Sequence, residues 1–90
     1  MAKRGKLEIM RDILIIIHSN KNLIKPTPLL RKSNMSSIRF KEYYSILLER
    51  RLIQEITDKK GDKYVVLTEK GFRFLEKYRT ITAFIEEFEL

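Results

Sequence analysis

The sequence predicts a mainly α-helical fold with a small β-hairpin, an α+β fold, within 90 residues. Before residue 52 and after residue 68, apolar residues recur at steps of three and four, the spacing that places side chains on one face of a helix. Between these regions, two runs with β-branched and aromatic residues flank a polar turn that contains Gly61, a pattern typical of a hairpin. A chain of this length is expected to form about one domain.

The first helix is expected over residues 6–19. Ile15 and Ile16 widen its apolar face, so we expect this helix to be the most buried element. His18, the single histidine, comes at its end, where an imidazole most often caps the negative end of the helix dipole. The residues expected to form the face itself are Leu7, Met10, Ile13, Leu14 and Ile17.

Two further helices are expected, separated by a short turn. Thr27 is a candidate N-cap and Pro28 suits the first helical position, which predicts a short helix over residues 28–32. Ser36 is a second candidate N-cap and opens a longer helix that runs to about residue 51. Two helices joined by such a turn are the signature of a helix-turn-helix. The inward stripe of the longer helix is predicted to be Phe40, Tyr43, Tyr44 and Leu47.

The hairpin is expected next, with strands over residues 52–57 and 64–67 and a turn between them. Thr68 then caps a last helix, and Glu69 lies in its first turn, where a carboxylate is favourable to the helix dipole. This last helix is expected to run to near residue 90.

Three stretches carry a resemblance to a known family: KSNMS at 32–36, YSILLERRLI at 44–53 and YVVLTEKG at 64–71. In this order they resemble the small archaeal winged-helix regulators and chromatin-type DNA-binding proteins that carry an extra C-terminal helix. The resemblance implies a winged helix-turn-helix domain over residues 1–70 and a dimerisation helix, continuous with it, over residues 71–90. Arg51 stands where the family often has glycine, which leaves open how sharply the preceding helix ends.

The resemblance, together with a net charge of +7, implies double-stranded DNA as the partner. The N-terminal end of the helix that Ser36 opens would enter the major groove. There Arg39 suits a guanine edge or a phosphate, and Ile38 suits a thymine methyl group. The candidate DNA contacts are Ser36, Ser37, Ile38, Arg39, Lys41 and Ser45 on this helix, Lys59, Lys60 and Lys63 at the hairpin tip, and Lys3 and Arg4 in a basic N-terminal arm.

Each of these groups also has a plainer interpretation. The helix residues can form an ordinary solvated face, and Glu42 and Glu49 favour that interpretation because carboxylates repel phosphates. The lysines of the tip can serve only to keep a hairpin soluble, and residues 1–6 can be a frayed terminus.

The last helix carries a heptad pattern, because apolar residues continue from Leu67 in alternating steps of four and three. Residues 1–79 contain all 19 basic and nine acidic residues, a balance of +10, whereas residues 80–90 contain three glutamates, a balance of −3. We expect this helix to pair two copies of the chain; the resemblance implies an antiparallel pair, and the pattern alone leaves the orientation open. The predicted dimerisation residues are Phe74, Tyr78, Ile81, Phe84, Ile85 and Phe88.

Other classes of function find little support in the sequence. There is no cysteine, a single histidine and no phosphate-binding glycine loop, so we expect no enzyme, metal, cofactor or small-molecule ligand. The longest apolar run has five residues, too short to span a bilayer, which predicts a cytoplasmic, nucleoid-associated protein. The expected function is therefore DNA binding by a dimeric transcriptional regulator. The alternatives are a sequence-nonspecific chromatin protein and a winged helix used for protein–protein contact.

Overall fold

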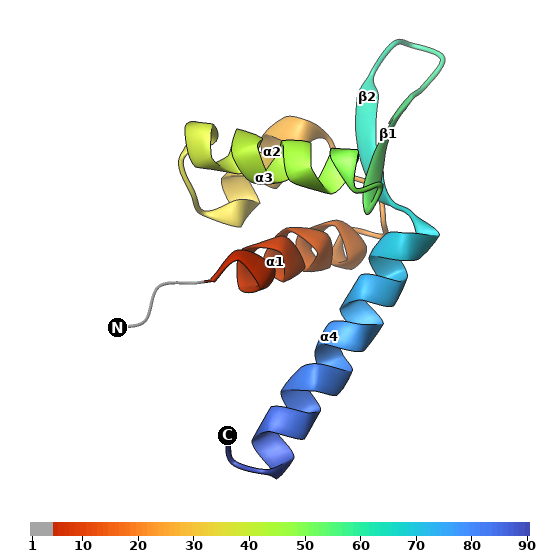
Figure 1. Cartoon of the computed structure of the whole chain (residues 1–90). Coiled ribbons are helices and arrows are strands. Elements are labelled where there is room, and N and C mark those ends of the chain that lie inside the picture. Colours follow the sequence, from red (N-terminus) through yellow and green to blue (C-terminus); the bar gives the residue numbers. More distant parts are fainter. Residues whose placement is uncertain (1–4) are drawn as a thin grey trace.

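The structure is a computed structural model that describes residues 5–90, so the predicted basic arm with Lys3 and Arg4 lies outside the described residues. It confirms the predicted class, with helices packed around a hairpin and a long last helix (Figure 1). The elements in chain order are α1 (Lys6–Ser19), α2 (Pro26–Ser33), α3 (Ser37–Glu49), β1 (Ile53–Thr57), β2 (Lys63–Leu67) and α4 (Glu69–Glu87).

The core forms around α1, which contacts α2, α3, β2 and α4. Ile13, Leu14 and Ile17 are fully buried, as the helical spacing predicts. Leu7 and Ile15, which were expected on the buried face, are exposed instead. Each lies in a groove between α1 and α4: Leu7 lines one with Phe74 and Tyr78, and Ile15 lines another with Phe72 and Leu75. The core is completed by Ile9 and Met10 from α1, Leu29 from α2, Leu47 from α3 and Val65 from β2.

The predicted start of α2 is wrong by two residues. Pro26 rather than Pro28 begins the helix, Lys25 is the N-cap residue, and Thr27 lies inside the first turn. Both prolines fit because the first turn of a helix has no intrahelical partner for its N–H groups, so a missing donor costs nothing there. The helix ends at Ser33, and its C-cap residue Asn34 adopts the left-handed conformation with φ 56°.

The start of α3 is as predicted, but its end comes earlier. The Ser36 hydroxyl accepts a hydrogen bond from the Arg39 N–H at 3.2 Å, which confirms the N-cap. The helix ends at Glu49, and Arg51 adopts φ 60° while Leu52 N–H bonds back to the Leu47 carbonyl at 2.9 Å. This is a Schellman ending, which usually has glycine at the left-handed position. Arg51 therefore ends α3 as sharply as glycine would, in a conformation that is strained for a side-chain-bearing residue.

The hairpin pairs β1 with β2 antiparallel, with Ile53 opposite Leu67 and Thr57 opposite Lys63. Ile24, between α1 and α2, forms an isolated β-bridge with β2: its N–H donates to the Val65 carbonyl at 3.2 Å, and the Val65 N–H donates to the Ile24 carbonyl at 2.7 Å. This pairing ties the hairpin to the segment between α1 and α2. We call the hairpin, residues 53–67, the wing; the bridge anchors it to the helical part of the fold.

The chain turns from β2 into α4 at residues 67–71, the LTEKG end of the third stretch, and the contacts there account for these residue types. Thr68 caps α4 by accepting a hydrogen bond from the Gly71 N–H at 3.1 Å, and its hydroxyl donates to the Arg51 carbonyl at 2.6 Å. Lys70 Nζ donates to the Arg50 carbonyl at 2.9 Å, at the end of α3. A Cβ atom on Gly71 would collide with the Leu52 carbonyl oxygen, so only glycine allows α4 to approach the α3–β1 loop this closely.

The first half of α4 packs on α1 and the second half extends away from the body (Figure 1). Tyr78 marks the end of the packed part, where the Arg11 guanidinium lies 5.0 Å from its ring centroid. Beyond it the apolar side chains are uncovered: Ile81 is 55% exposed, Phe84 56%, Ile85 40% and Phe88 56%. None of the helices within residues 5–90 combines the length and hydrophobicity needed to cross a bilayer.

Candidate nucleic-acid interface

The outward face of α3 carries the candidate base-contacting side chains. Phe40 is buried and Tyr44 stacks on it with ring centroids 5.5 Å apart, which fixes the opposite side of the helix toward solvent. Ile38 is 75% exposed, in the second position of the helix. At about 100° per residue, Lys41 and Ser45 share this outward side with Ile38, and both are exposed. The structure therefore brings three of the predicted contacts together.

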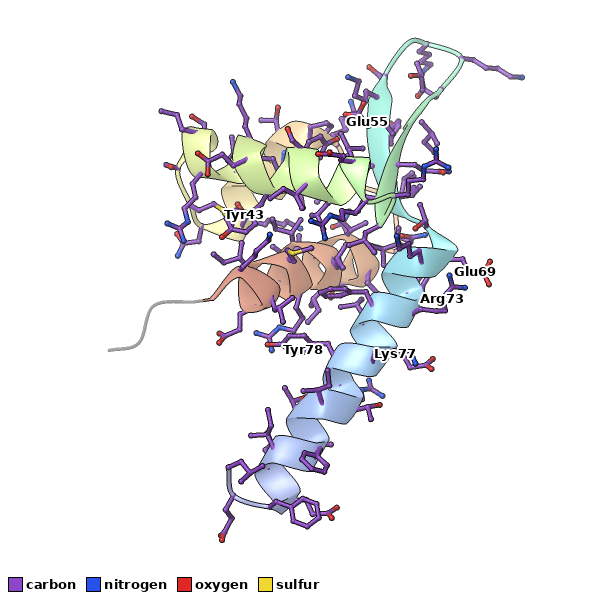
Figure 2. The ribbon with its side chains drawn as sticks, viewed as in Figure 1. Tyr43, Glu55, Glu69, Arg73, Lys77 and Tyr78 are labelled. Atoms are coloured by element: carbon purple, nitrogen blue, oxygen red, sulfur yellow. The ribbon has the colours of Figure 1, made fainter. Side chains whose placement is uncertain are left out.

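The remaining predicted α3 residues lie at the edges of this face. Arg39 is exposed, and its guanidinium lies 5.9 Å from the ring centroid of Tyr43, on the side of α3 that faces α1 (Figure 2). Ser37 is exposed in the first turn. The Ser36 oxygen already accepts a hydrogen bond within the cap, which leaves its O–H free to donate to a phosphate.

The recognition helix itself carries no net charge. Residues 37–49 hold two basic side chains, Arg39 and Lys41, and two acidic ones, Glu42 and Glu49. Both carboxylates are exposed on the outward side. A neutral helix attracts the phosphate backbone weakly, so α3 is suited to contact bases rather than to supply the electrostatic part of the affinity.

The wing is also balanced in charge, and its lysines differ in position. Lys59 and Lys60 are exposed in the turn, where Asp58 accepts hydrogen bonds from the N–H groups of Lys60 and Asp62, both at 2.9 Å. Lys63, predicted at the tip, is instead the first residue of β2. Residues 53–67 hold three basic and three acidic side chains. Only two lysines thus project at the tip.

A hydrogen bond joins the wing to the recognition helix. The Tyr44 hydroxyl donates to Glu55 Oε2 at 2.6 Å, and Lys63 Nζ lies 3.6 Å from Glu55 Oε1. Burial and the hydrogen bond to Glu55 raise the pKa of Tyr44, so its hydroxyl stays protonated and remains a donor. Glu55 projects from β1 near the end of α3 (Figure 2). The first contact links the wing to α3, and the second lies within the hairpin, between β2 and β1.

The sequence reasoning missed a basic segment beside α3. Residues 20–36, which contain α2, hold four basic side chains and no acidic one. Lys25 lies 5.7 Å from the ring centroid of Tyr64 and 3.9 Å from Asp62 Oδ1, so it lies between α2 and the wing. A count of charge by helix rather than by half-chain would have found this segment. Its cations are Lys21, Lys25, Arg31 and Lys32.

Among residues 5–90, no group of three or more His, Cys, Asp or Glu side chains is placed to hold a metal ion. His18 lies in the last turn of α1, as predicted, and its ring packs edge-on against Phe72 with centroids 5.7 Å apart.

Three helices followed by an antiparallel hairpin, with α2 and α3 joined by a short turn, define a winged helix-turn-helix domain. A sequence model described as winged helix-turn-helix matches residues 3–86, and the chain belongs to this family. The resemblance inferred from the three stretches is thereby confirmed. A search of curated proteins found no match.

Solved structures share the fold at low sequence identity. Sso10a-2, a DNA-binding protein from Sulfolobus solfataricus, is 21% identical with a TM-score of 0.74, covering 96% of this chain and 86% of its own. F93 from STIV, a winged-helix DNA-binding protein, is 19% identical with a TM-score of 0.72, covering 89% and 91%. SSV1 F-93 is 23% identical with a TM-score of 0.63, covering 88% and 91%. At these identities the likeness shows the common fold.

Proposed function

We propose that this chain binds double-stranded DNA as a homodimer and acts as a transcriptional regulator. The observation that carries the proposal is the outward face of α3, where the 75% exposed Ile38 lies beside Lys41 and Ser45. An apolar side chain so fully exposed on a recognition helix is suited to a thymine methyl group in the major groove. The two structural neighbours described as DNA-binding proteins are in keeping with this.

In this proposal the contacts divide by element. The outward side of α3 contacts base edges, and the cations of residues 20–36 contact the backbone, because the first helix of a helix-turn-helix crosses the phosphates. Lys59 and Lys60 extend from the wing to the backbone or minor groove on the flank of the site. Lys63 lies 3.6 Å from Glu55 Oε1, so its charge is partly offset and it adds less to the positive charge at the tip.

A titration of duplex DNA at several salt concentrations tests the proposal. Contacts to phosphates release counterions, so the logarithm of the association constant should fall linearly with the logarithm of salt concentration. A variant that loses two cations, Arg31→Gln with Lys32→Gln, is compared with the wild type; both residues are solvent-exposed at the end of α2. It should lower the slope by about two. A wild-type affinity that does not change between low and moderate salt would refute DNA binding.

The dimer is proposed to form through α4. Ile81, Phe84, Ile85 and Phe88 make a continuous exposed stripe, and such a patch on a monomer is a liability unless a partner covers it. The stripe runs into a groove of about 310 Å³ between α4 and the start of α1, with Leu7 at its edge. Phe74 and Tyr78, the other predicted dimerisation residues, line the same groove.

The charge of α4 supports antiparallel pairing. Parallel pairing would place the two acidic ends, with Glu86, Glu87 and Glu89 on each, side by side. Antiparallel pairing keeps these ends apart and separates the two recognition helices by the length of the paired helices. Linking two DNA-binding domains in this way raises the affinity for DNA beyond that of one domain.

A second candidate function is that of a sequence-nonspecific chromatin protein. The neutral charge of α3 and the concentration of cations on elements that contact the backbone favour it, because backbone contacts carry no sequence information. Footprinting across genomic and random duplexes distinguishes the two. Protected sites that recur at the same sequence support a regulator, and uniform protection supports the chromatin role.

A further inference from the structure

The cations at the tip of the wing depend on contacts made farther down the hairpin. The turn that carries Lys59 and Lys60 extends beyond the helices (Figure 1). Below it, Val65 of β2 pairs with Ile24 along one edge and with Glu55 along the other. Lys59 follows Glu55 by four residues, about 13 Å of extended chain. A small rotation of the hairpin at the level of Glu55 therefore moves the tip cations by a larger distance.

Glu55 lies on the face of the hairpin that packs against the helices. Successive side chains of a strand alternate between its two faces, so Glu55 shares its face with Ile53, which is buried. From α3, the Tyr44 hydroxyl donates to Glu55 Oε2 at 2.6 Å. The Tyr44 ring stacks on the buried Phe40, which restricts the position of its hydroxyl. The contact thus connects the wing to a side chain that is itself held by the core.

A carboxylate is unfavourable at this place for a DNA-binding surface. It lies between α3 and the wing, the two elements proposed to contact DNA, and a negative charge there repels phosphates. Its oxygens contact the Tyr44 hydroxyl and, at 3.6 Å, Lys63 Nζ. Hydrogen bonds to an ionised acceptor are stronger than those between neutral groups. A firmer link between the wing and α3 is the physical gain that the carboxylate provides.

We propose that Tyr44 is a positioning residue for DNA binding: through Glu55 it holds the wing where Lys59 and Lys60 reach the backbone of the duplex that α3 contacts. The inference rests on the proposed function, and in it Tyr44 itself contacts no DNA. A hydrogen bond that served only the stability of the fold would leave the DNA affinity of the folded chain unchanged when it is removed.

Two substitutions of Glu55 isolate the hydrogen bond. Glu55→Gln and Glu55→Ala remove the same negative charge and both release Lys63, but of the two new side chains only the amide can accept a hydrogen bond from the Tyr44 hydroxyl. Glu55 is exposed, so both variants should fold, and circular dichroism checks this. Each is made in the wild-type chain, in a Tyr44→Phe chain and in a chain with Lys59→Gln and Lys60→Gln. The affinity for one duplex is then measured at moderate salt.

The Glu55→Gln chain should bind the duplex about fivefold more tightly than the Glu55→Ala chain, since one hydrogen bond between neutral groups shifts an equilibrium by about this factor. The difference should vanish in the Tyr44→Phe background, which lacks the donor. It should also vanish in the background without the two tip lysines, which leaves no tip cation to position. A matched control, Tyr43→Phe, removes a hydroxyl from the adjacent residue and keeps the ring beside Arg39, so it should bind as the wild type does.

The salt dependence gives a second readout. Tyr44→Phe alone should reduce the slope of the logarithm of the association constant against the logarithm of salt concentration. The reduction should approach the value of about two expected for the loss of both tip lysines. A change confined to fold stability would leave this slope unaltered.

Equal affinities of the Glu55→Gln and Glu55→Ala chains with Tyr44 present overturn the inference. A difference that persists without Lys59 and Lys60 overturns it too, because Glu55 would then act on the duplex by another route. The two proposals can fail separately. A wild-type chain that binds the duplex while these two variants bind equally contradicts the positioning role alone. A wild-type chain that binds no duplex contradicts the proposed function together with it.

Discussion

Replacing Phe84 with alanine is expected to break the proposed dimer while leaving the protomer folded. Phe84 is 56% exposed on α4. An aromatic side chain buries about 150–250 Å² when covered, so about 100 Å² of Phe84 is available to a partner. At about 25 cal/mol per Å², that area stabilises the dimer by about 2.5 kcal/mol per protomer, or about 5 kcal/mol for the symmetric pair.

Alanine retains a small part of this area, so Phe84→Ala should weaken dimerisation by about 4 kcal/mol, which is about a thousandfold in the dissociation constant. The folded protomer should persist because alanine has the highest helix propensity and the lost side chain contacts no core residue. Sedimentation equilibrium over a wide range of protein concentration measures the dissociation constant, and far-ultraviolet circular dichroism checks the helix content.

The matched control is Ile38→Ala, which removes another exposed apolar side chain from a different helix. It should leave the dimer intact and weaken binding to the preferred duplex. A Phe84→Ala chain that dimerises as tightly as the wild type refutes the assignment of the stripe. So does a wild-type chain that sediments at 10.8 kDa at every concentration.

Three further variants follow from the local geometry. Arg51→Gly should raise the free energy of unfolding in urea by roughly 1 kcal/mol, since φ 60° is strained for arginine; an equal loss would show that the strain is absent. Gly71→Ala should lower it by about 3 kcal/mol or more, because the new Cβ collides with the Leu52 carbonyl; a neutral effect would contradict the close approach. Lys59→Gln with Lys60→Gln should lower the affinity for duplex DNA. It should also reduce the slope of the logarithm of the association constant against the logarithm of salt concentration by about two, whereas a protein-contact module would show no change.

Interactions that are local in the chain were predictable from sequence. Ser36 and Thr68 were identified as N-caps, and both accept the expected backbone hydrogen bonds. The hairpin followed from Gly61 and its flanking strands. These predictions succeed because a cap or a turn involves residues a few positions apart, so its energetics are encoded in a short stretch.

One error was a local ambiguity, and the other differences arose where distant segments meet. Pro26 was not recognised as the start of α2, because two prolines two residues apart both satisfy the first-turn rule. Leu7 and Ile15 belong to the apolar pattern of α1, yet the path of α4 decides which of the apolar residues are covered. Ile24 pairs with a strand some forty residues later, a contact that no local pattern reveals.

By itself, the sequence determined the order of the elements, the α+β class and the apolar stripe of the last helix, because periodicity and capping act within each element. Only the tertiary structure decided where the charge lies in space. It brought Lys70, at the start of α4, against the end of α3, where its Nζ donates to the Arg50 carbonyl at 2.9 Å. The physical reason is that the close approach allowed by Gly71 brings two helices far apart in the chain into contact.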